Sequence, residues 1–171
     1  MARVGVILNP YSGHGIAAHM ASWLRRRLGD QLNLTIVSPA SDVATWARQN
    51  AESGCERIVI VGGDGTFRSV AAALIGLDTP IGLVATGTNN NISRALGLPA
   101  DPYEATEVAL SDDPEWVTAG RVNGYIFFEE VSVGLEAELW PVGEAFVRHH
   151  LRGLLEAPVA LATNEPTAVK V

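Results

Sequence analysis

The 171-residue chain has almost no cysteine and almost no lysine. Cys55 is the single cysteine, which excludes an intramolecular disulfide and a multi-cysteine metal site and is typical of a reducing, cytoplasmic compartment. Lys170 is the single lysine. P-loop enzymes and protein kinases both need an internal lysine on the phosphates, so the sequence fits neither class. Any phosphate bound here must be held by backbone N–H groups, hydroxyls, amides, arginine or a metal.

Long apolar runs and excess positive charge are also missing. No run approaches the ~18 apolar residues of a membrane-spanning helix, and residues 1–10 lack the pattern of a signal peptide. The net charge is −7, so we expect no nucleic-acid partner. Hydrophobic residues make up 47% of the chain and charged residues 18%, which indicates a packed globular core.

Apolar runs alternate with helical patterns along the first half of the chain. Strands are predicted at residues 3–8, 32–37, 57–61 and 80–85, and helices at 16–28, 43–52 and from 66 to about 74. Ser41 is the expected cap of the second helix. The tryptophans at positions 23, 46, 116 and 140 are expected in the core or in domain contacts. The alternation predicts an α/β fold: an open, mainly parallel sheet with helices on both faces.

The pattern changes near residues 112–114. Two β-rich runs follow, at 116–122 and 125–133, separated by Asn123-Gly124, which is a strong hairpin signal. A helix-like stretch covers about 136–156. We therefore expect an α/β domain over residues 1–120 and the beginning of a β-rich second domain over residues 121–171.

Polar, glycine-rich loops follow three of the four predicted strands, at residues 9–15, 62–66 and 87–91. The carboxyl ends of parallel strands lie at one edge of a sheet, where ligands bind in open α/β folds. The three loops should therefore converge on one site. Each loop alone also has an ordinary explanation as a turn or a helix cap.

Residues 62–66 are the most informative of these loops, because three glycines surround one acid. Paired glycines permit close approach of the backbone to a phosphate, and we expect a side chain at Gly63 to fill the space that the phosphates need. Asp64 could reach a metal ion or a hydroxyl, or cap the helix that follows. Thr66 could bind a phosphate.

The motifs together resemble the diacylglycerol kinase catalytic-domain family, which includes bacterial lipid kinases and sphingosine kinases. They are Asn9-Pro10-x-Ser12-Gly13, Gly62-Gly63-Asp64-Gly65-Thr66, and Gly87-Thr88-x-Asn90-Asn91 followed by Arg94 to Pro99. The resemblance covers residues 1 to about 157. The nucleotide-binding fold of that family is similar to those of phosphofructokinase and NAD kinase. Residues 62–66 alone match NAD kinase equally well, whereas the third motif favours a lipid kinase.

The resemblance implies a kinase that uses ATP and Mg²⁺ to phosphorylate a lipid hydroxyl, on diacylglycerol or a relative. It implies a catalytic role for Asp64, which could also contact the metal. The implied nucleotide-binding residues are Asn9, Ser12, Gly13, Ser38, Gly62, Gly63, Asp64, Gly65, Thr66, Gly87, Thr88 and Asn90. Peripheral contact with the inner membrane face and a homodimer are both left open.

The chain is shorter than members of that family. Family members continue into a β-rich domain that closes over the lipid, whereas this sequence stops at Val171. We therefore expect the chain to be incomplete and to have little lipid kinase activity alone. The alternatives are an NAD kinase-like enzyme and a non-catalytic nucleotide-binding fragment.

Overall fold

The computed structural model describes residues 3–12, 16–38, 41–111 and 113–129. All of them belong to one compact unit that extends to Glu129. The helix predicted at 136–156 and the end of the second β-rich run lie outside the described residues. The domain boundary at residue 120 stays a prediction.

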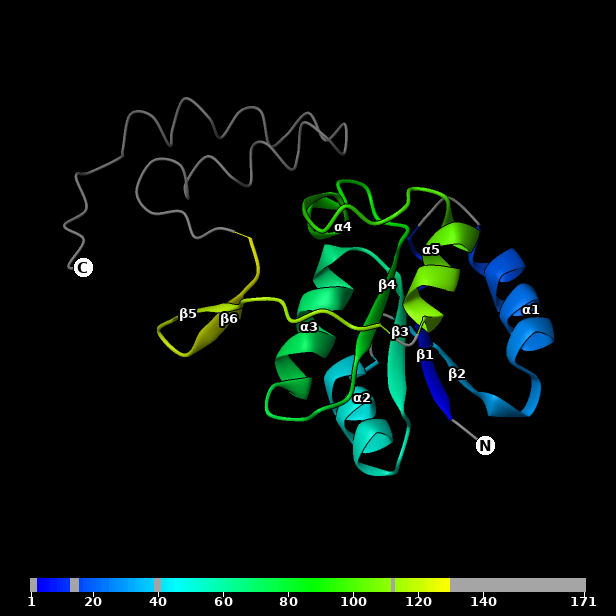
Figure 1. The fold of residues 1–171 in the computed structure, drawn as a ribbon, viewed down its shortest axis with the longest axis horizontal. Coiled ribbons are helices and arrows are strands. Elements are labelled where there is room, and N and C mark those ends of the chain that lie inside the picture. The colour runs from blue at the N-terminus through cyan, green and yellow to red at the C-terminus, as the bar shows by residue number, and fades with distance from the viewer. Residues whose placement is uncertain (1–2, 13–15, 39–40, 112, 130–171) are drawn as a thin grey trace. The chain divides into compact units, whose positions relative to one another are not determined.

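A four-stranded parallel sheet forms the centre of this unit (Figure 1). Its strands lie in the order β2-β1-β3-β4. In β1, Val6 is paired with Leu34 of β2 on one side and with Val59 of β3 on the other. The parallel α/β sheet predicted from the sequence is thereby confirmed. The strands span Val4–Leu8 (β1), Leu32–Ile36 (β2), Arg57–Gly62 (β3) and Ile81–Ala85 (β4).

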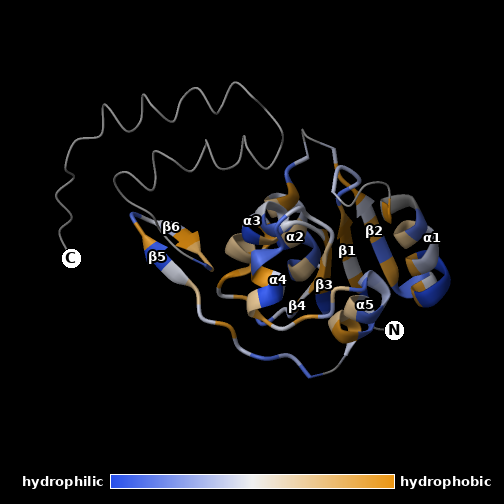
Figure 2. Ribbon diagram, turned by 90° about the horizontal axis from the view of Figure 1, so that it is seen from above, coloured by the Kyte–Doolittle hydropathy of each residue, from blue (hydrophilic) through white to orange (hydrophobic). Residues whose placement is uncertain are grey.

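Helices cover both faces of the sheet, and the apolar strands lie between them (Figure 2). Helices α1 and α5 pack on one face, while α2, α3 and α4 pack on the other. Because both faces of the sheet are covered, the strands are continuous apolar runs in the sequence. The helices span Ile16–Leu28 (α1), Val43–Glu52 (α2), Asp64–Leu74 (α3), Asn91–Ala95 (α4) and Pro102–Leu110 (α5), and a 3₁₀ turn, η1, covers Gly29–Gln31.

Helix α5 was not expected, although its start carries a clear signal. Asp101 accepts hydrogen bonds from the backbone N–H groups of Tyr103 and Glu104, both at 2.9 Å, and Pro102 occupies the first helical position. An acidic cap followed by proline is a common start of a helix.

One local prediction was wrong. The cap of α2 is Asp42, which accepts a hydrogen bond from the Thr45 N–H at 3.0 Å; Ser41 instead accepts one from the Ser38 N–H at 2.8 Å. Trp116 is 93% exposed among the described residues, so it is not part of this core, and its place in a domain contact stays a prediction. Trp23 and Trp46 do pack against the core, as expected. Trp140 lies outside the described residues.

The predicted hairpin is present, in a shorter form. Strands β5 (Gly120–Val122) and β6 (Tyr125–Phe127) pair antiparallel, so the first strand begins at residue 120 rather than 116. Asn123 and Gly124 both have positive φ, as a two-residue hairpin turn of this kind requires. The Phe128 ring meets Phe67 of α3 edge-on, with centroids 5.2 Å apart.

No helix among the described residues is long and apolar enough to cross a membrane.

Candidate functional site

The candidate site lies where the strand order reverses, between β1 and β3. The chain passes from β1 outward to β2 and then returns across β1 to β3. In open α/β sheets, ligands bind at such a switch point, outside the carboxyl ends of the strands. Here Asn9 leaves β1 and Gly63 leaves β3, and the Asn9 N–H donates to the Val61 carbonyl at 2.8 Å.

Asn9 joins the first and second loops through its side chain. Its Oδ1 accepts a hydrogen bond from the Tyr11 N–H at 3.0 Å, which shapes the first loop. Its Nδ2 donates to Thr66 Oγ1 at 3.3 Å. Asn9 and Thr66, 57 positions apart, are therefore neighbours at the edge of the sheet, as the sequence predicted for the loops.

Ser12 joins the first loop to the third. Its hydroxyl donates to the Asn9 carbonyl at 2.8 Å, and its Oγ lies 2.7 Å from Thr86 Oγ1. Thr86 follows β4, is buried, and donates its backbone N–H to the Gly62 carbonyl at 2.9 Å. Thr86 could not be selected from the sequence alone, because its contacts depend on the alignment of β4 with β3.

Gly63 and Gly87 hold the second and third loops in close backbone contact. A Cβ at Gly63 would lie 3.1 Å from Gly87 Cα, and a Cβ at Gly87 would lie 2.7 Å from Gly63 Cα. Each residue must therefore be small for the other to fit. This contact gives Gly63 a reason to be glycine that does not involve the space for phosphates that we expected.

Gly65 differs from these two glycines. It is exposed in the first turn of α3, and a Cβ there would meet nothing within 4 Å. Packing within the described chain therefore does not require glycine at position 65. The open space in front of its backbone is available to a ligand.

Asp64 binds the start of a different helix from its own. Its carboxylate accepts hydrogen bonds from the backbone N–H groups of Asn91 at 3.1 Å and Ile92 at 3.3 Å, at the beginning of α4. The N-cap position of α3 is taken by Gly63, which makes no side-chain bond. Asp64 is thus a helix cap, but it caps α4 rather than the helix that follows it in sequence.

Asn90 has a strained backbone and an unused acceptor. Its φ is +51°, in the left-handed region that asparagine tolerates better than most residues. Its Oδ1 is buried, and within the part of the chain that the structure describes it has no hydrogen-bond partner. A buried amide oxygen without a partner is costly, so it is a natural acceptor for a donor on a ligand.

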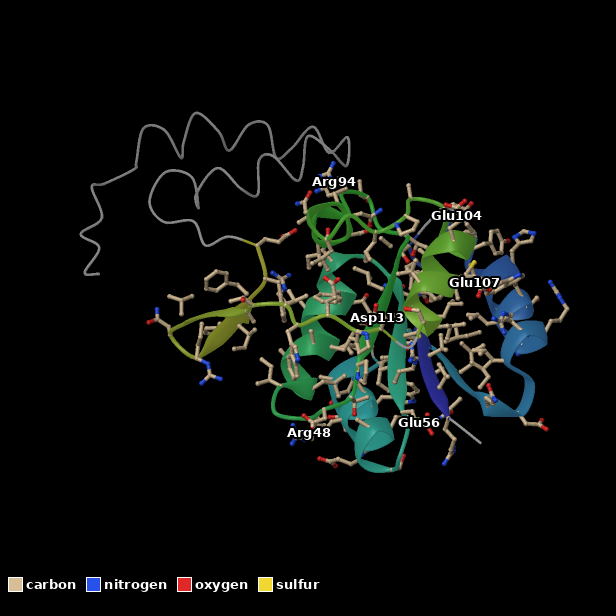
Figure 3. The ribbon with its side chains drawn as sticks, viewed as in Figure 1. Arg48, Glu56, Arg94, Glu104, Glu107 and Asp113 are labelled. Carbon is tan, nitrogen blue, oxygen red and sulfur yellow. The ribbon has the colours of Figure 1, made fainter. Side chains whose placement is uncertain are left out.

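The remaining predicted residues lie at the rim of the site or outside the described structure. Ser38 follows β2 and is exposed, with its hydroxyl 3.1 Å from that of Ser41. Thr88 is exposed in the third loop. Gly13 is not among the described residues. Arg94 belongs to α4 and lies at the opposite end of the sheet from Arg48 and Glu56 (Figure 3). Its guanidinium donates to Asn91 Oδ1.

The described residues offer one carboxylate, Asp64, for a metal ion at this edge. Nowhere in residues 3–12, 16–38, 41–111 and 113–129 do three His, Cys, Asp or Glu side chains cluster as a metal site would require. Each Asp64 oxygen already accepts one N–H and retains a second lone pair. Asp64 therefore fits Mg²⁺ that takes its other ligands from phosphates and water, as Mg²⁺ commonly does.

Comparison with known proteins identifies relatives of this chain. Residues 3–122 match the model of the diacylglycerol kinase catalytic domain. The diacylglycerol kinase of Bacillus subtilis is 31% identical over 145 residues, which are 81% of this chain and 48% of that protein. A protein of Chromohalobacter salexigens named "Probable lipid kinase YegS-like" is 31% identical over 118 residues, covering 67% of this chain and 38% of its own length.

Solved structures agree on the fold. The crystal structure of a diacylglycerol kinase from Bacillus anthracis superimposes with a TM-score of 0.64 at 24% identity, covering 73% of this chain and 47% of that one. This chain thus spans less than half the length of these relatives. Because the family model covers most of the sequence, the chain belongs to the diacylglycerol kinase catalytic domain family.

Proposed function

We propose that this chain binds Mg-ATP at the three joined loops and serves an ATP-dependent lipid kinase that phosphorylates diacylglycerol or a related lipid. Membership of the family and the names of two relatives support a lipid kinase. The observation that carries the proposal is the direct bonding of all three loops at the switch point: Asn9 to Thr66, Ser12 to Thr86, and Asp64 to the start of α4.

Helix α3 supplies the place for the phosphates. Its N-terminus faces the edge at which the strands end, and its positive dipole end and free N–H groups favour an anion. Gly65 leaves that backbone uncovered. Ser12 and Thr66 add hydroxyls from the joined loops, which suits a site whose loops contain no lysine.

For phosphoryl transfer, the main contribution of the protein is to position the reactants. Phosphoryl transfer proceeds with little covalent participation by side chains, so held phosphates and an aligned acceptor hydroxyl supply most of the rate. Mg²⁺, when bound, would neutralise charge on the phosphates. Asp64 is the first residue of α3, and we assign to its carboxylate the contact with the metal or with the acceptor hydroxyl.

Calorimetry on the 171-residue chain tests the proposal. We expect Mg-ATP to bind, and Gly65→Ala to weaken binding about tenfold, because the added methyl group occupies the open space before α3. The fold should tolerate this change, since alanine is favoured in helices by about 1 kcal/mol. Ala72→Ser, on the exposed side of the same helix and about two turns further along, is the matched control and should bind ATP normally.

Two further assays separate the alternatives. Preferential binding of NAD over ATP would favour an NAD kinase-like enzyme. Transfer of radiolabel from ATP to diacylglycerol in mixed micelles tests catalysis, and binding without transfer would favour a nucleotide-binding role. Absence of ATP binding by the folded wild-type chain would contradict the proposal.

A further inference from the structure

We infer that Thr86 is a positioning residue, which directs the hydroxyl proton of Ser12 toward a bound phosphate. This inference rests on the proposed function, because it concerns the phosphates of the nucleotide. It starts from the contact between Ser12 Oγ and Thr86 Oγ1, which are 2.7 Å apart and come from loops 74 positions apart in sequence.

The two hydroxyl protons can be assigned from the available acceptors. A hydroxyl has one proton to donate. Ser12 Oγ is 2.8 Å from the Asn9 carbonyl, to which only Ser12 can donate. If Ser12 gives its proton to Asn9, Thr86 donates to Ser12 and both protons are bonded. In the opposite arrangement, the buried Thr86 hydroxyl would have no acceptor among the described residues.

Thr86 is held firmly enough to direct its neighbour. Thr86 is 6% exposed, and its backbone N–H donates to the Gly62 carbonyl at 2.9 Å. The end of β3 therefore sets the position of Thr86. Thr86 therefore fills one lone pair of Ser12 Oγ from the interior side. The Ser12 proton must point away from Thr86, toward the Asn9 carbonyl or toward a ligand.

This arrangement prepares Ser12 to donate. When a phosphate oxygen arrives, the Ser12 proton can move from the Asn9 carbonyl to the phosphate by rotation about one bond, while the bond from Thr86 is kept. Donation from Thr86 also polarises the Ser12 hydroxyl, which strengthens its own donation to an anion. Without the Thr86 hydroxyl, the Ser12 hydroxyl loses this polarisation, and its proton is held by the Asn9 carbonyl alone.

Thr86→Val removes the hydroxyl and retains the branched shape, and Thr86→Ser restores the hydroxyl. By calorimetry, we expect Thr86→Val to weaken Mg-ATP binding about fivefold, the worth of one hydrogen bond, and Thr86→Ser to bind within about twofold of wild type. Adenosine, which has no phosphates, should bind wild type and Thr86→Val equally. In a Ser12→Ala background, Thr86→Val should cause no additional loss.

The outcomes separate this role from the proposed function. An equal loss of affinity in the Ser12→Ala background, an equal loss for adenosine, or no recovery in Thr86→Ser would show that Thr86 only supports the fold and would overturn the inference. Wild-type protein that binds no ATP would instead contradict the proposed function, and this role with it. Thr86→Ala replaces Thr86→Val in the same comparisons if thermal melting shows that the valine variant does not fold.

Discussion

The loops after β3 and β4 look alike in sequence but are built differently. The loop after β3 leads into α3, an 11-residue helix whose buried side chains Phe67, Val70, Ala71 and Leu74 anchor it to the sheet. The loop after β4 passes through left-handed Asn90 into α4, which has five residues. The loop after β3 is stabilised by its own helix, whereas the loop after β4 relies on bonds from its neighbour.

Three contacts make the loop after β4 dependent on the loop after β3. Gly63 and Gly87 touch through their backbones, Thr86 N–H donates to the Gly62 carbonyl, and the Asp64 carboxylate accepts from the N–H groups at the start of α4. A change in the loop after β3 should therefore disturb both loops. A change on the outer side of either loop should weaken ligand binding alone.

Gly63→Val should have the largest effect. The valine would press against Gly87, because its Cβ alone would lie 3.1 Å from the Gly87 Cα. Overpacking of this kind costs about 1–3 kcal/mol, so we expect the melting temperature to fall by about 3–10 °C together with a loss of ATP binding. Circular dichroism melting and calorimetry provide the measurements. Gly65→Ala should lose affinity for ATP, whereas its melting temperature should be unchanged or raised. Equal melting temperatures for Gly63→Val and wild type would disprove the close contact between Gly63 and Gly87.

Asp64→Asn should have the next largest effect. The amide offers one acceptor oxygen in place of two, so one N–H of α4 loses its partner, and the charge that would face Mg²⁺ is removed. In a phosphoryl-transfer assay on a full-length homologue or a reconstituted enzyme, we expect turnover to fall about a hundredfold, equivalent to ~3 kcal/mol. ATP affinity measured with EDTA present should change much less.

Asp78→Asn is the matched control for this charge change, since Asp78 is exposed in the connection between α3 and β4. It should retain full activity. Near-normal turnover of Asp64→Asn would remove Asp64 from the mechanism and leave it only the capping of α4.

The sequence predicted the parts of the fold that depend on local pattern. The strands were recognisable because both faces of each are covered, and the hairpin because Asn123-Gly124 suits positive φ. Convergence of the loops followed from parallel topology alone. Partners across the site could not be predicted in this way, since pairing of Ser12 with Thr86 depends on the register of β4 and on the rotamer of each hydroxyl.

The same limit applies to Asp64 and to α2. Asp64 was recognised as a cap candidate, but only three-dimensional proximity brings its carboxylate to α4 instead of α3. At the start of α2, Ser41 and Asp42 are adjacent and both are good caps, so one residue of backbone placement decides between them. Helix α5 is different, because Asp101-Pro102 is a local signal from which the start of this helix can be predicted.

The smallest effect on stability should come from a change at the cap of α2, which is not part of the three loops. Hydrogen bonds from the Thr45 hydroxyl, at 2.6 Å, and from the Thr45 N–H lower the pKa of Asp42. A carboxyl whose pKa is lower in the folded than in the unfolded chain stabilises the fold fully above its unfolded pKa of about 3.9 and loses this contribution as the pH falls through its folded value. Thr45→Val removes the hydroxyl, so it should melt slightly below wild type at pH 7, and the two melting temperatures should converge as the pH falls through the lowered pKa of Asp42 and its carboxylate is protonated in both proteins. Melting temperatures measured from pH 2 to 7 test this, and ATP affinity at pH 7 should be the same in both proteins. A gap that stays constant down to pH 2 would show that the Asp42 charge plays no part in capping α2.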